Sequence, residues 1–125
     1  MSTLYQQELM DHYRFPRNRG TIEKPTFCHD ELNPSCGDKI SMSGIVKDGV
    51  LTKVAFTGTG CVISQAAASM LTEEVVGKAV VDIQELSGDL VKELVGLPMG
   101  PTRFKCALLS LQVLQHGLRD SLSNS

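Results

Sequence analysis

The sequence predicts an α+β fold in which a small antiparallel sheet of about three strands packs against helices. Apolar residues alternate on both sides of a turn signal at 47–49, which is typical of a β-hairpin. Helical periodicity precedes this hairpin and dominates the chain after it. With 125 residues, 42% of them hydrophobic, the chain can bury one core. We therefore expect a single domain over residues 1–125.

An opening helix is expected over residues 3–14, with Thr3 as its cap and a broken apolar stripe along one side. The following segment contains Pro16 and Gly20, which end this helix. Residues 21–38 are expected to be irregular, with room for a short edge strand near 26–31.

The hairpin is predicted from residue 40 onward, with Ile40, Met42, Gly44 and Val46 on one face of its first strand. Its second strand spans 51–57, with Val54 and Phe56 facing the core. This strand is expected to lead into a flexible loop at 58–60, because two of those three residues are glycine.

The second half of the chain is predicted to be helical. Gly77 suits the position just past the end of the first of these helices. The expected helices span 61–76, about 80–87, about 88–95 and, after a rigid break at 97–101, from about 102 or 104 to 118. The tail at 121–125 is expected to be frayed.

Chemistry concentrates in four residues that each stand where a loop or turn signal ends: Cys36, Asp38, Cys61 and Cys106. Gly37 permits a positive φ or a close approach of the backbone to a metal. If the segment is extended, Cys36 and Asp38 on either side of Gly37 point to the same face. Cys61 is expected at a helix start, where free amides and the helix dipole favour thiolate. Cys106 is expected at or near another helix start, where Arg103 and Lys105 also favour thiolate.

Three thiolates and one carboxylate would complete a tetrahedral zinc shell, and the same soft sulfur ligands suit iron–sulfur clusters. A carboxylate exchanges more readily than a fourth thiolate would, which favours a site that releases its content. Spacing alone leaves open three unrelated thiols, because gaps of 25 and 45 residues separate the cysteines and no CxxC pair is present.

The fourth cysteine and the three histidines are not expected to belong to this site. Cys28 and His29 are expected to be incidental, with an auxiliary ligand pair or a spare sulfur acceptor as the alternative. His12 is expected to pack or to lie on the surface, and His116 to suit the negative end of the last helix.

Composition argues against several functions. A net charge of −2 provides no basic surface for nucleic acid, and no apolar run approaches the ~18 residues that span a membrane. The first residues are polar and acidic, unlike a secretory signal, so a cytoplasmic location is expected. Free or metal-bound thiols are favoured there over disulfides.

Four ordered segments resemble the IscU/SufU/NifU N-terminal family of iron–sulfur cluster assembly proteins. The first runs from Asp11-His12-Tyr13 through Pro16-Arg17-Asn18 to Gly20, and the others are Cys36-Gly37-Asp38, the segment 56–61 with its Ala-rich helix, and 103–108. The likeness covers nearly the whole chain and implies a SufE/NifU-like fold.

The resemblance implies a scaffold that receives sulfur from a cysteine desulfurase and passes a [2Fe–2S] cluster to acceptor or carrier proteins. It makes Cys36, Asp38, Cys61 and Cys106 the metal or cluster ligands. Cys36 and Cys61 are the expected sulfur acceptors, with Arg103 and Lys105 in support. The chain is expected to be a monomer or weak oligomer.

The SufU branch implies an alternative, in which the same four residues hold zinc and the protein is a sulfurtransferase partner of the desulfurase. Lys105 stands where IscU-type proteins carry histidine, which resembles SufU, whereas the chain length resembles IscU. The sequence after Leu97-Pro98 departs from the IscU chaperone motif. We expect a scaffold without turnover of its own, with sulfur transfer as the enzymatic alternative, and a plain zinc-stabilised fold as a third possibility.

Overall fold

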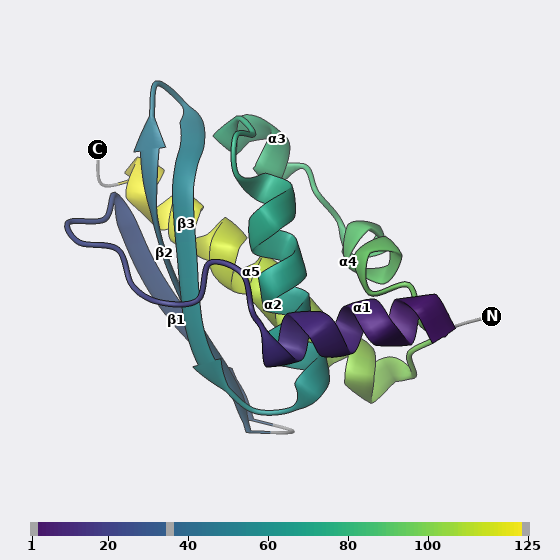
Figure 1. Ribbon diagram of the computed structural model, residues 1–125. Coiled ribbons are helices and arrows are strands. Elements are labelled where there is room, and N and C mark those ends of the chain that lie inside the picture. Colours follow the sequence, from purple (N-terminus) through teal and green to yellow (C-terminus); the bar gives the residue numbers. More distant parts are fainter. Residues whose placement is uncertain (1–2, 35–36, 124–125) are drawn as a thin grey trace.

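The computed structural model describes residues 3–34 and 37–123 and confirms the expected α+β fold (Figure 1). Its elements are α1 (Thr3–Arg14), β1 (Phe27–Asn33), β2 (Asp38–Lys47), β3 (Val50–Thr59), α2 (Val62–Val75), α3 (Val80–Gln84), α4 (Gly88–Val95) and α5 (Pro101–Ser123). The strands form one antiparallel sheet in the order β1-β2-β3, so the edge strand expected near 26–31 is present as β1.

The β2–β3 hairpin closes as its sequence predicts. Asp48 and Gly49 both have positive φ, 53° and 78°, as a two-residue type I′ turn requires. Thr52 then interrupts the ladder, because Ile45 pairs with Lys53 whereas Val46 pairs with Leu51. This bulge shifts the alternation by one residue, so that Leu51 is buried together with Val54 and Phe56.

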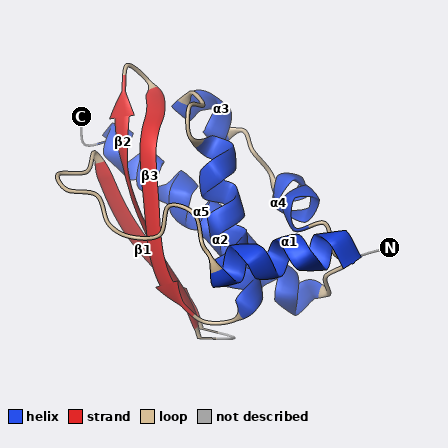
Figure 2. Ribbon diagram, in the orientation of Figure 1, coloured by secondary structure: helices blue, strands red, loops and turns tan. Residues whose placement is uncertain are grey.

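Two long helices cover one face of the sheet (Figure 2). α5 packs against β1 and β2, α2 packs against β3, and the two helices contact each other. Fully buried Phe56, Leu71, Val113 and Leu114 belong to the core between these layers. α1 and α4 pack on α2, so the antiparallel sheet has helices segregated to one side.

Three boundaries differ from the expectations. Gly58 and Thr59 belong to β3 and pair with Ile40 and Lys39, so the expected loop at 58–60 is wrong for 58–59, and only Gly60 lies outside the strand. A Cβ at Gly58 would collide with the Lys39 carbonyl, so this glycine serves strand packing rather than flexibility.

The last helix begins at Pro101, a favoured residue for a first helical position, and continues to Ser123. The frayed tail is therefore wrong for 121–123, and 124–125 lie outside the described residues. No helix in the described part of the chain has the length and apolarity needed to cross a membrane.

Candidate functional site

One end of the sheet brings two of the expected ligands together. Asp38 opens β2, and the adjacent Lys39 pairs with Thr59 at the end of β3. Only Gly60 separates that strand from Cys61, the residue that precedes α2. Strand pairing therefore fixes Asp38 opposite the β3–α2 junction.

Asp38 and Cys61 are in direct contact. The Cys61 amide donates to Asp38 Oδ1 at 2.8 Å, and its thiol donates to Asp38 Oδ2 at 3.4 Å. Asp38 is fully buried, whereas Cys61 is exposed. Gly60, with φ 135°, permits this approach because any Cβ there would collide with the Asp38 carboxylate. The sequence marks Gly60 as a loop glycine but does not reveal this close packing.

α5 supplies the third expected ligand. The side-chain oxygen and sulfur atoms of Asp38, Cys61 and Cys106 all lie within 4.8 Å of one another, so three stretches that are distant in sequence meet here. Cys106 is only 4% exposed. It is the sixth residue of α5, so it lies near the helix start but past the four free amides.

The donor set fits a tetrahedral metal. With bonds of about 2.3 Å to sulfur and about 2.1 Å to oxygen, tetrahedral geometry places sulfur and oxygen about 3.6 Å apart. The observed distance between Cys61 Sγ and Asp38 Oδ2 is 3.4 Å. These three residues could therefore hold zinc or iron with little movement, leaving one position for a fourth ligand.

The fourth expected ligand, Cys36, lies outside the described residues. Its neighbour Gly37 has φ 74°, the positive value that the sequence allowed for, and its amide donates to the Asn33 carbonyl at 2.8 Å. Gly37 is thus in a turn, so the argument from an extended segment does not apply there.

The two expected supporting cations are exposed. Arg103 lines an apolar cavity of about 390 Å³ with Leu97 and Met99. Lys105 lines a different cavity, of about 310 Å³, that runs along α5 toward Glu31. The locations of Arg103 and Lys105 neither support nor contradict the expected supporting role in sulfur transfer.

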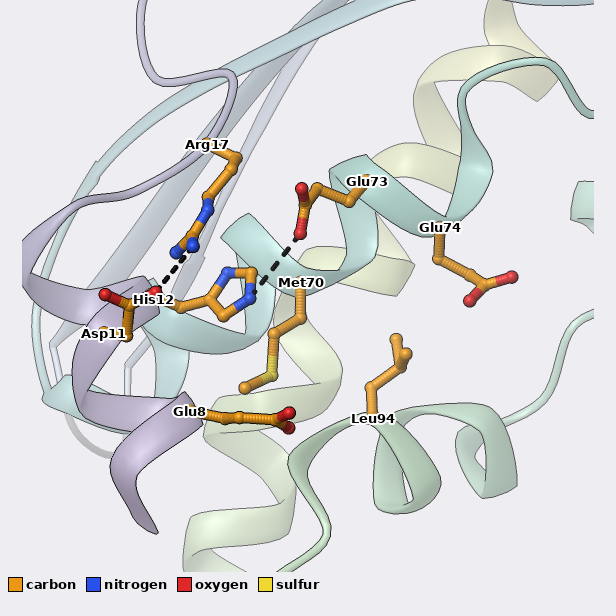
Figure 3. A pocket seen from close by; sticks show the side chains of 8 residues that line it. All are labelled: Glu8, Asp11, His12, Arg17, Met70, Glu73, Glu74 and Leu94. Carbon is orange, nitrogen blue, oxygen red and sulfur yellow. Dashed lines mark hydrogen bonds and ion pairs between the residues drawn. The ribbon is translucent and has the colours of Figure 1, made fainter. Parts of the chain in front are cut away.

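A cavity of about 520 Å³ lies apart from the thiols, between α1, α2 and α4 (Figure 3). His12 points toward Glu73 there, and Arg17 toward Asp11. His12 Nδ1 also bonds Ser69 Oγ at 2.7 Å, as expected of a packing histidine. None of the residues lining this cavity is a cysteine, so the thiol centre remains the better candidate for chemistry.

Comparisons with known proteins identify the family of this chain. The family model described as NifU-like N terminal domain matches residues 4–124. The chain is 33% identical to the zinc-dependent sulfurtransferase SufU of Bacillus subtilis, covering 94% of this chain and 91% of that protein. It is 30% identical to the iron–sulfur cluster assembly scaffold protein IscU of Thermotoga maritima, covering 93% of each.

Solved structures share the fold. A nitrogen-fixing NifU-like protein (N-terminal) from Brucella abortus superposes with a TM-score of 0.78 at 19% identity, covering 99% of this chain and 98% of that one. At that identity the likeness concerns the fold alone.

Proposed function

The chain belongs to the NifU-like N-terminal domain family, and from this premise we propose that it is an iron–sulfur cluster assembly protein. It accepts sulfur from a cysteine desulfurase and binds a [2Fe–2S] cluster or a metal ion for delivery to acceptor proteins. Cys36, Asp38, Cys61 and Cys106 hold that content.

The convergence of Asp38, Cys61 and Cys106 carries this proposal. Two sulfurs and a carboxylate from three separate elements form a soft, anionic ligand set that suits zinc and iron–sulfur clusters. Cys36 is two residues before Asp38 in sequence, which supports it as the fourth ligand.

Sulfur transfer requires a thiolate that a partner protein can reach. The Cys61 or Cys36 thiolate attacks the terminal sulfur of the desulfurase persulfide, forming a new S–S bond. The bond between the two persulfide sulfurs breaks, and the desulfurase cysteine leaves as thiolate. Cys61 is exposed, which supports it in this role.

A zinc-dependent sulfurtransferase is the second candidate. A relative with 33% identity bears that name, and Lys105 precedes the third ligand as in the SufU branch. In this version the metal holds the thiolates until the desulfurase docks, and no cluster is carried.

Metal analysis and the absorption spectrum of freshly purified protein separate the two candidates. The scaffold is expected to be coloured after reconstitution with iron and sulfide, whereas the transferase is expected to be colourless with about one tightly held zinc per chain.

Both candidates predict that Cys61→Ser reduces metal content and sulfur transfer from a desulfurase labelled with ³⁵S. Cys28→Ser is the matched control, because Cys28 is also an exposed thiol but lies outside the site. Unchanged metal content and transfer in Cys61→Ser and Cys106→Ser would reject the proposed function.

A further inference from the structure

A second cluster of metal-binding side chains lies between β1 and α5. Phe27, His29 and Glu31 are on the same face of β1, because side chains alternate along a strand, and this face packs against α5. His116 projects from α5 to meet them. The ligand atoms of His29, Glu31 and His116 all lie within 4.8 Å of one another.

Glu31 is the centre of this cluster. Its Oε2 accepts hydrogen bonds from His29 Nε2 at 2.8 Å and from His116 Nδ1 at 2.5 Å. The two imidazole rings are nearly perpendicular, with an angle of 86° and centroids 6.1 Å apart. Two imidazole nitrogens thus converge on one carboxylate oxygen.

The backbone permits this convergence because residue 117 is glycine. A Cβ at Gly117 would lie 2.8 Å from the Phe27 ring and 3.0 Å from His29 Cβ. Without that Cβ, β1 can approach α5 closely enough for His29 to lie beside His116.

Other features resemble a built metal site. The side chains of His29 and Glu31 are each 27% exposed, which leaves an entry path without full exposure to solvent. Asp120 Oδ2 lies 3.9 Å from His29 Nδ1, beyond hydrogen-bond distance, and would have to move closer to become the carboxylate partner that metal-bound histidines usually have.

We propose that His29, Glu31 and His116 form a second site for a divalent transition-metal ion, separate from the cysteine centre. Two imidazoles and one carboxylate suit zinc and ferrous iron and leave at least one coordination position for water. In a tetrahedral shell with bonds of about 2.1 Å, ligand atoms are about 3.4 Å apart. The three side chains therefore need to separate by less than about 1 Å as the ion replaces the hydrogen bonds.

This second site shares helix α5 with the cysteine centre. His116 is ten residues after Cys106 on the same helix, or about 15 Å along its axis. The cavity of about 310 Å³ is lined by Glu31 and also by Lys105, the neighbour of Cys106.

The test is a Zn²⁺ titration of the full chain, followed by NMR of the histidine rings. The chain has three histidines, so His12 is an internal control. After the cysteine centre is filled with one equivalent, a second equivalent is expected to shift the ring nitrogens of His29 and His116 and leave those of His12 unchanged. Unchanged His29 and His116 resonances would overturn the proposal.

Glu31→Gln is expected to abolish the second equivalent and to keep the first. Glu73→Gln is the matched control, because Glu73 also pairs with a histidine, at 3.5 Å from His12. Retention of the second equivalent by Glu31→Gln, or its loss from both variants, would count against the site. The ring resonances report on this site even if the cysteine centre proves to have another function.

Discussion

Asp38 places a carboxylate at a fully buried position, where an unpaired charge would be strongly disfavoured. The Cys61 amide donates to one of its oxygens, and the Cys61 thiol approaches the other. These bonds give the carboxylate an alternative to metal coordination. At the scale of single residues, Asp38 is therefore suited to be the exchangeable ligand.

Asp38→Ala is accordingly expected to hold a bound cluster or metal several-fold longer than the unchanged protein. The remaining thiolates are stronger ligands, and the competing carboxylate is gone. The measurement is the decay of cluster absorbance, or of bound zinc, in the presence of a chelator. Asp38→Asn is the control that keeps an acceptor for the Cys61 amide. Faster loss from Asp38→Ala would contradict this role.

Gly60→Ala is expected to destabilise the protein. An alanine at φ 135° is strained by about 1–3 kcal/mol, and its Cβ would also displace the Asp38 carboxylate. Gly100→Ala is the matched control, since a Cβ there meets nothing within 4 Å. Denaturant unfolding of both variants tests this, and equal effects would contradict it.

His12 confers a pH dependence on folding. Burial, followed by the nearby Arg17 charge, lowers the pKa of His12 below its ordinary 6.5. The Arg17 amide donates to Ser69 Oγ at 2.8 Å, so the Ser69 hydroxyl can donate to a neutral His12 Nδ1. Neutral His12 is therefore the form that the folded state favours.

Because the folded-state pKa is lowered, this stability is fully present above pH 6.5 and is lost as the pH falls through that pKa. The free energy of unfolding is expected to decline from about pH 7.5 to about pH 5, and less steeply in His12→Gln. Denaturant titrations at several pH values measure both slopes. If the free energy of unfolding declined equally with pH in both proteins, His12 would not be the cause of the pH dependence.

At the scale of elements, Gly117 sets the distance between α5 and β1. Alanine would favour the helix by about 1 kcal/mol, but its Cβ would press on Phe27 and His29, and overpacking costs about 1–3 kcal/mol. Gly117→Ala is expected to be net destabilising in denaturant unfolding. Gln112→Ala, at an exposed position on α5, is the control and is expected to be near neutral. A more stable Gly117→Ala would show that β1 can move away freely.

The elements differ in how far their sequence could predict them. The β2–β3 hairpin was predictable because Asp48-Gly49 supplies its turn locally. The bulge at Thr52 and the inclusion of Gly58 in β3 depend on pairing with β2, which local periodicity does not show. The motifs singled out Asp38, Cys61 and Cys106 before their proximity was known, whereas the cluster around Glu31 depends on how α5 crosses β1.

At the scale of the whole molecule, the cysteine centre joins three elements that meet only after folding. Asp38 comes from β2, Cys61 precedes α2, and Cys106 lies on α5. A metal bound there ties the sheet to both long helices. Its binding energy is therefore added to the stability of the folded chain.

Zinc is expected to raise the thermal unfolding midpoint, and chelation to lower it again. Free metal at about 1,000 times the dissociation constant would add about 4 kcal/mol to the free energy of unfolding. Calorimetry with and without zinc measures the shift. Cys106→Ser should lose most of it and Cys28→Ser none, so a full shift in Cys106→Ser would contradict the stabilising role.

The two described thiols of this centre differ in exposure, and this difference decides which of them a partner protein can reach. Cys61 is open to solvent, whereas Cys106 is 4% exposed and covered by its own fold. A sulfur atom carried on another protein's surface can touch Cys61 without any rearrangement, but it cannot touch Cys106 in that way. Under the proposed function, sulfur would therefore be loaded through Cys61, and Cys106 would be a buried ligand.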